Sequence, residues 1–343
     1  MSFKKSILFL GFSVTADKSG FAYNSAKILS EKFNFKIDVC GLGGLQPQHI
    51  IFLIEEILEK YDNEYIILEL NTSGWRTAKL SNEAYYMAYR YIFEICHRYS
   101  RKMIILNLPR KDVDYSSDLS TDILHDLCRT FNSKILDLSK KYYKNLHFDE
   151  ILKDEVHPNS YGTDLYTRDV VDFLIGFNDD YYFSVVDYFF EKKTFWLQAP
   201  NNKYYELLSF ERTGCELPCY KLKTSNTLSF LVDHNNNLVN GVLSVWGPRG
   251  GKITVHSLND DISFYAYDAY SYYNRFAVVK FKGIKSKIIM LTLSEEIPSL
   301  NLLKGNINSE TREVLIAGLL CLNNRKWEIA NRKVKIFLNE ILV

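Results

Sequence analysis

The chain has 343 residues, of which 47% are hydrophobic and 24% are charged. This length exceeds what one compact core usually needs and favours two domains, and the composition is typical of a globular protein. Forty-two Lys and Arg against 41 Asp and Glu leave a formal net charge of +1. Because this balance provides no electrostatic basis for binding nucleic acid or an anionic membrane, we expect a small-molecule or glycan substrate.

The N-terminal stretch "MSFKKSILFLGFSVTAD" carries two lysines before a short apolar run, as a secretory signal does. Gly11 and Ser13 interrupt the run, however, and cleavage after Ala16 would discard Ser13. No segment approaches the ~20 apolar residues that span a bilayer. The cysteines are scattered among apolar neighbours, which is typical of reduced thiols. We therefore expect a cytoplasmic protein, with secretion as the alternative.

The first half of the chain alternates short apolar runs with amphipathic segments. The apolar runs predict strands over 6–11, 35–41, 65–70, 102–109 and 134–139, and the segments between and after them predict helices over 19–33, 47–61, 81–100, 120–131 and 160–176. The runs are apolar throughout, as in parallel strands covered on both faces. This pattern predicts an α/β domain over residues 1–178 with a doubly wound parallel sheet.

From about residue 181 the pattern changes to short segments rich in β-branched and aromatic residues, separated by Gly, Asn and Asp turns. The predicted strands cover 193–199, 204–210, 219–224, 227–233, 241–247, 251–257, 262–270, 275–283 and 287–293. This pattern predicts a β-rich domain over 179–343, an antiparallel sandwich or jelly roll. Periodicity leaves residues 308–343 open between a helix and two further strands.

Small and polar residues follow the predicted parallel strands. In open α/β sheets the ligand crevice lies beyond the carboxyl ends of the strands. The residues at this edge are Ser13 after the first strand, Gly44 in "CGLGGLQ" after the second, Asn71 after the third, and Asp154 and His157 in "DEVHPNSYG" before the last helix. We expect these five residues to lie at one rim of the sheet.

These residue types are the ones that acyl transfer requires. A serine hydroxyl needs an imidazole to take its proton, and the imidazole needs a carboxylate to fix its tautomer. Asp154 precedes His157 by three residues, so one turn can bring them together. The oxyanion of the tetrahedral intermediate needs preorganised donors, which Gly44 and Asn71 can supply. Ser13, His157 and Asp154 therefore form the candidate catalytic triad.

The segments "GFSVT", "GLGG", "ELN" and "DEVHPNSYG" resemble, in the same order, the four sequence blocks of the SGNH (GDSL-like) hydrolase superfamily. The resemblance covers roughly residues 6–175 and implies a flavodoxin-like α/β/α fold. It implies that Ser13 is the nucleophile and, through its backbone N–H, an oxyanion donor together with Gly44 and Asn71. His157 would be the base and Asp154 the residue that orients it.

Three positions depart from the blocks of that superfamily. Phe12 stands where aspartate usually precedes the serine, Glu69 replaces a glycine, and Thr72 replaces a second acidic residue. These differences indicate a divergent branch, but all five candidate residues are present.

The sequence thus favours an ester hydrolase that acts on a small acyl group, acetyl, of a saccharide, partly by analogy with families that pair such a domain with a β-sandwich. The same triad would serve a carbohydrate O-acetyltransferase if the acceptor were a sugar hydroxyl. An alternative that is not an enzyme is a catalytically inactive module that binds a glycan or a protein. The changes at Phe12 and Glu69 favour this alternative. A nucleotide-dependent enzyme is a weaker alternative, because the motifs of phosphate-binding loops are missing.

Further residues are candidates for substrate contacts. Trp75 and Arg76 follow Asn71 closely and could line the substrate site, although core packing explains them equally well. The aromatic run 264–276 could stack on sugar rings, but strand packing also accounts for it. "CELPC" has no second ligand pair nearby, so we expect no metal site, and nothing in the sequence calls for a cofactor.

Overall fold

The computed structural model describes residues 4–73, 81–113, 119–144, 147–176, 181–201, 205–232, 237–306 and 310–341. The chain divides into two compact units. The first comprises residues 1–190, 213–215 and 330–343, and the second comprises 191–212 and 216–329. The sequence had suggested a boundary at 178/179 and an uninterrupted second domain.

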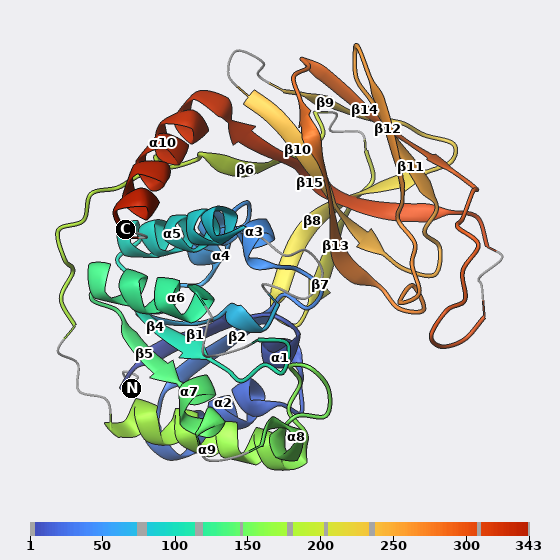
Figure 1. Ribbon diagram of the computed structural model, residues 1–343. Coiled ribbons are helices and arrows are strands. Elements are labelled where there is room, and N and C mark those ends of the chain that lie inside the picture. The colour runs from blue at the N-terminus through green and yellow to red at the C-terminus, as the bar shows by residue number, and fades with distance from the viewer. Residues whose placement is uncertain are drawn as a thin grey trace. The chain divides into compact units, whose positions relative to one another are not determined.

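The first unit contains a parallel sheet of five strands in the order β2-β1-β3-β4-β5 (Figure 1). The strands are β1 (Ser6–Gly11), β2 (Lys36–Gly41), β3 (Tyr65–Glu69), β4 (Lys102–Asn107) and β5 (Lys134–Asp137). This strand order is the flavodoxin-like one. β2 is added on one side of β1, and β3, β4 and β5 are added on the other side, so the topological switch point lies between β1 and β3. The predicted doubly wound parallel sheet is therefore confirmed.

Helices cover both faces of this sheet (Figure 1). They are α1 (Ser13–Ala16), α2 (Phe21–Phe33), α3 (Pro47–Ile50), α4 (Ile54–Lys60), the 3₁₀ turn η1 (Asn71–Ser73), α5 (Asn82–Arg98), α6 (Leu119–Thr130), α7 (Leu138–Tyr143), α8 (Phe148–Ile151) and α9 (Ser160–Gly176). One buried cluster joins alternate strand residues, Phe9 and Ile67 among them, to Phe21 of α2 and Tyr166 of α9. Because successive strand residues face opposite sides, the residues between them are buried on the other face.

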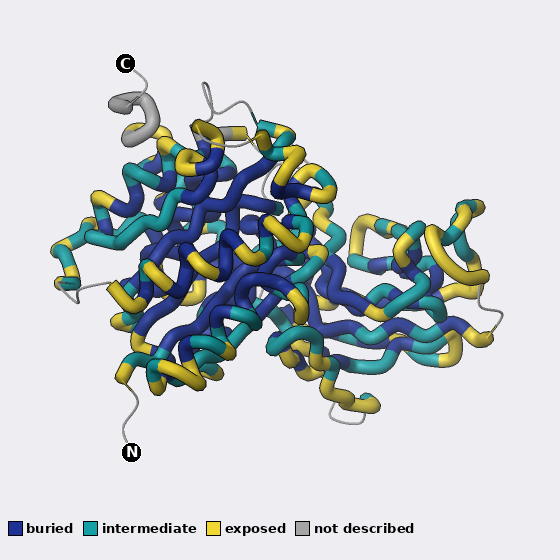
Figure 2. The backbone as a smooth tube through the Cα atoms, turned by 90° about the horizontal axis from the view of Figure 1, so that it is seen from below, coloured by how far each residue is buried: buried dark blue, intermediate teal, exposed yellow. Residues whose placement is uncertain are grey.

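The second unit is built from antiparallel sheets, as the sequence predicted. One sheet has the order β13-β10-β15-β8-β7, with β6 also paired to β15, and the other has the order β12-β11-β14-β9. The strands are β6 (Phe195–Gln198), β7 (Leu207–Arg212), β8 (Cys215–Lys223), β9 (Leu228–Leu231), β10 (Asn237–Trp246), β11 (Lys252–His256), β12 (Asp261–Tyr265), β13 (Arg275–Ile284), β14 (Ile288–Ser294) and β15 (Glu313–Asn323). Val255, Leu291 and Ile316 belong to the buried cluster that the two sheets share, and Figure 2 shows the buried stretches of chain.

The C-terminal segment, which periodicity left open, is a strand followed by a helix. β15 pairs with β10, β8 and β6 and is buried along most of its length. α10 (Asn324–Ile341) follows it directly, and its residues from Ala330 onward belong to the first unit.

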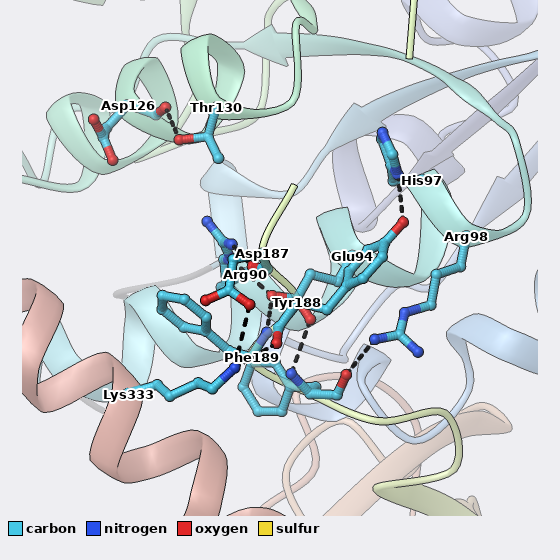
Figure 3. A network of polar contacts seen from close by, with 11 residues as sticks. Arg90, Glu94, His97, Arg98, Asp126, Thr130, Asp187, Tyr188, Phe189 and Lys333 are labelled. Carbon is cyan, nitrogen blue, oxygen red and sulfur yellow. Dashed lines mark hydrogen bonds and ion pairs between the residues drawn. The ribbon is translucent and has the colours of Figure 1, made fainter. Parts of the chain in front are cut away.

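Residues 181–190 are the end of the first unit's N-terminal segment. They are held against α5 by a buried ion pair between two residues of that helix (Figure 3). Nε of Arg90 donates to Glu94 at 2.7 Å, and the two side chains are 3% and 0% exposed. Glu94 also accepts the N–H groups of Phe189 (2.8 Å) and Phe190 (2.9 Å), while Arg90 donates to the Asp187 carbonyl at 2.7 Å. These contacts satisfy both buried charges.

In the ranges described above, no helix is both long and apolar enough to cross a membrane.

Candidate active site

Ser13 is the first residue of α1, immediately beyond the carboxyl end of β1. The intervening turn is tight. A Cβ at Gly11 would lie 2.2 Å from Thr15 Oγ1 and 2.8 Å from Glu69 Oε2, so only glycine fits there. The chain turns at Phe12, whose side chain is buried. Ser13 itself is half-buried.

His157 and Asp154 lie in the loop between α8 and α9, as the sequence predicted. His157 Nε2 is 2.8 Å from Ser13 Oγ, although the two residues are 144 positions apart. On the other side of the ring, Nδ1 is 2.9 Å from Asp154 Oδ2 and 3.0 Å from Oδ1. Serine, histidine and aspartate are thus joined in one chain of hydrogen bonds.

The loop around His157 is fixed by its own backbone. Lys153 N–H donates to the His157 carbonyl at 2.9 Å, and Leu152 pairs with Pro158 as an antiparallel bridge. The side chain of Asn159 accepts the N–H of Gly162 at 2.9 Å, as expected of the residue that caps α9. The imidazole is therefore carried by an ordered turn at the start of a long helix.

Asp154 is held in its charged form. Partial burial alone would raise its pKa, but hydrogen bonds from the N–H groups of Val156 and His157, together with the interaction with the His157 ring, hold the pKa of this carboxyl below its usual range. The N–H groups lie 3.0 and 2.9 Å from Oδ1. A charged Asp154 accepts from His157 Nδ1 and so leaves Nε2 to accept the serine proton.

The glycine loop after β2 packs against α1. Leu42 N–H donates to the Gly11 carbonyl at 2.8 Å. A Cβ on Gly43 would lie 3.7 Å from Ser13 Cα, so this glycine faces the candidate nucleophile. Gly44, the residue chosen from sequence, is exposed and has a φ of 93°, a conformation that favours glycine. Because nothing local distinguishes the two adjacent glycines, the choice of Gly44 as the oxyanion donor stays a prediction.

Asn71 begins η1 and is buried in a polar network. Its Nδ2 donates to Asn107 Oδ1 at 2.7 Å, and its Oδ1 accepts from the Tyr85 hydroxyl at 2.9 Å. Asn107 in turn donates to Ser139 at 2.8 Å and to Asp137 at 3.1 Å. These contacts orient the Asn71 carboxamide, and Nδ2 has a second hydrogen to donate. Sequence reasoning found neither Tyr85 nor Asn107, since nothing local marks them.

Glu69, one of the departures from the superfamily pattern, is buried beside these elements. It is 1% exposed. Its Oε2 accepts from the Thr15 hydroxyl at 3.0 Å, and its Oε1 accepts from the Thr72 hydroxyl at 2.6 Å. Burial raises the pKa of Glu69 from 4.5 to about 7, although hydrogen bonds from both threonines oppose the shift.

Other candidates are less informative. Trp75 and Arg76 lie outside the described residues. In the aromatic run of the second unit, Tyr270 is 48% exposed, and the Arg275 guanidinium lies 5.9 Å from its ring centre. Within the described part of the chain, no group of three or more His, Cys, Asp or Glu side chains could hold a metal ion.

No protein-family model and no curated protein matches the chain. Solved structures do match it. A two-domain esterase (CEX) active on acetylated mannans superimposes with a TM-score of 0.61 at 14% identity, over 93% of this chain and 91% of that one. The form of that esterase co-crystallised with mannopentaose also gives 0.61 and 14%, over 93% and 90%. This chain therefore shares the two-domain fold of that protein, an α/β unit with a parallel sheet and a second unit of antiparallel sheets, as predicted from the sequence.

Proposed function

We propose that this protein is a serine esterase that removes small acyl groups, acetyl above all, from a saccharide. The observation that carries the proposal is the hydrogen-bonded chain from Ser13 Oγ through the His157 ring to Asp154. The likeness in fold to an esterase active on acetylated mannans supports the substrate class.

The reaction uses each group in turn. Ser13 Oγ attacks the ester carbonyl carbon while its proton passes to His157 Nε2, which Asp154 stabilises as imidazolium. The tetrahedral intermediate collapses, the bond to the sugar oxygen breaks, and that oxygen takes the proton from His157. Water then attacks the acyl-serine in the same way, which releases acetate and restores Ser13. Transfer to a sugar hydroxyl in place of water would make the protein an O-acetyltransferase.

The oxyanion would be stabilised by the Ser13 N–H, the Gly44 N–H and the Asn71 side-chain amide. Each such donor contributes roughly 10²- to 10³-fold to kcat in serine hydrolases. The buried network around Asn71 supports this role, because a preorganised amide loses no energy in reorienting when the charge develops.

The proposal is tested by mass spectrometry after exposure to a fluorophosphonate, which loses fluoride when an activated serine bonds to its phosphorus. We expect one adduct, on Ser13, in the wild-type protein and none in Ser13→Ala or His157→Ala. Folded wild-type protein that forms no adduct on Ser13 would contradict the proposal and would favour the non-catalytic binding module.

Tyr85→Phe tests the oxyanion role of Asn71. The substitution removes the hydroxyl that donates to Asn71 Oδ1, so the amide is less firmly oriented. We expect kcat for an acetyl ester to fall about 10-fold, with a smaller change in KM, since the lost alignment acts on the transition state. Steady-state kinetics would measure both constants.

Tyr91→Phe is the matched control for this prediction. Tyr91 lies on the same helix, but its hydroxyl donates to Glu55 at 2.8 Å. We expect its kcat to stay at the wild-type value. Equal kinetic effects in the two variants would show that Asn71 is not oriented by Tyr85.

A further inference from the structure

Glu69 joins the two elements that carry the candidate nucleophile and the candidate oxyanion amide. It ends β3, and its carboxylate lies between α1 and η1. On the α1 side, Oε2 accepts from Thr15 at 3.0 Å and faces the Phe12 N–H at 3.5 Å. On the η1 side, Oε1 accepts from Thr72 at 2.6 Å.

The contacts of Glu69 flank the reacting residues on both sides. Phe12 and Thr15 enclose Ser13 in sequence, and Thr72 follows Asn71 directly. A shift of the Glu69 carboxylate would therefore move the Ser13 turn and the Asn71 turn relative to each other. The same carboxylate also accounts for Gly11, because any Cβ there would collide with Glu69 Oε2.

The burial of Glu69 lowers the stability of the folded protein. A buried carboxylate loses its hydration, and among the described residues no ion pair reaches Glu69 to offset the loss. Among the described residues, Tyr89 of α5 interacts electrostatically with Glu69 and with Arg110, and Arg110 donates to the Asn71 carbonyl at 2.8 Å. Arg110 is itself paired with Asp112. A carboxyl group kept in such a place without an ionic partner calls for a reason other than folding.

We propose that Glu69 is a positioning residue, whose two carboxylate oxygens hold the Ser13 turn and the Asn71 turn at the separation at which both reach the same ester carbonyl. This inference rests on the proposed esterase function. Glu69 itself does not touch the substrate, and its effect passes through Thr15 and Thr72. Misplacement of reacting groups by fractions of an ångström to 1 Å lowers rates by up to about 10²-fold, so the expected effect is large enough to measure.

The experiment compares Glu69→Gln with the wild type for hydrolysis of an acetyl ester. Glutamine keeps the volume but cannot accept on both sides, so we expect kcat to fall roughly 10- to 100-fold while KM changes less than about 3-fold. Glu31→Gln, an exposed glutamate on α2, is the control for loss of a charge in the same unit, and its kcat should equal that of the wild type. A Glu69→Gln variant with wild-type kcat would overturn the inference.

Stability against pH gives a second readout. The pKa of Glu69 is raised in the folded state, so the favourable contribution of its neutral form is complete below about 4.5 and is lost as pH rises to about 7. Urea unfolding should therefore show wild-type stability falling over this window more steeply than that of Glu69→Gln. Identical slopes in the two proteins would contradict the buried, unpaired state on which the inference depends.

Four threonine variants test the inference if the Glu69→Gln protein does not fold. Thr15→Val and Thr72→Val each remove one hydroxyl that donates to the carboxylate, and Thr15→Ser and Thr72→Ser keep it. We expect both valine variants to lose kcat and both serine variants to recover it. Valine variants with wild-type kcat would overturn the inference. If the wild-type protein does not hydrolyse acetyl esters and forms no fluorophosphonate adduct on Ser13, the proposed function fails, and this inference fails with it.

Discussion

Replacement of Ser13 by alanine is expected to lower kcat for an acetylated saccharide by roughly 10³- to 10⁶-fold. In the proposed mechanism, the variant loses the atom that forms the acyl-enzyme bond. The remaining donors can still bind and polarise the ester, so a residual rate above that of water is expected. Because Ser13 is half-buried and loses one oxygen, the thermal midpoint should change little. Acetate release from acetylated mannan, followed with purified protein, would measure the effect.

His157→Ala should be equally inactive, and the double variant should be no slower than either single one, since serine and histidine act as a unit. Ser19→Ala is the matched control. This exposed serine lies just beyond α1, and its hydroxyl donates to Asp17 at 2.7 Å. Ser13→Ala protein that keeps more than about a tenth of the wild-type kcat would exclude covalent catalysis by this residue. Acetyl groups recovered on an acceptor sugar, rather than as acetate, would identify a transferase.

The parallel sheet could be predicted from sequence because its strands are buried on both faces. "SILFLG", "YIILEL" and "KMIILN" are apolar without alternation, as the strands of such sheets usually are, and they alternate with amphipathic segments at helical spacing. The predicted helix 47–61 was wrong in one respect, since it is broken into α3 and α4. Residues 50–54 are all apolar and 0–8% exposed. A continuous helix would spread five consecutive residues around its circumference, whereas the break allows all of them to be buried.

The candidate site could be predicted only in part. Ser13, Asn71, Asp154 and His157 follow strands or precede a helix, so topology brings them to one rim. Their supporting residues could not be found in this way. Glu69 differs from the superfamily pattern, and from sequence this difference indicates only a divergent branch or favours the inactive alternative. The structure instead shows a carboxylate bonded to threonines on two elements, a contact that depends on strand order and not on local spacing.

Replacement of Arg90 by alanine is expected to lower the free energy of unfolding by about 3–5 kcal/mol, because it leaves the buried Glu94 carboxylate without its ionic partner. Burial raises the pKa of Glu94 even with Arg90 present, which shows how poorly this site solvates a charge. The guanidinium also lies over two aromatic rings, 4.2 Å from the centre of Phe189 (Figure 3) and 4.8 Å from that of Phe131. Urea denaturation followed by circular dichroism would measure the change.

Arg90→Met combined with Glu94→Leu separates the charge from the packing. Removal of both charges avoids an unpaired buried group, so we expect this double variant to recover most of the stability that Arg90→Ala loses. It still lacks the acceptor for the N–H groups of Phe189 and Phe190, which should cost roughly 1–3 kcal/mol. The segment 181–190 would then be held mainly by its apolar contacts, and proteases should cleave it faster than in the wild type. A double variant as unstable as Arg90→Ala would show that the unpaired charge of Glu94 is not the main cause of the loss.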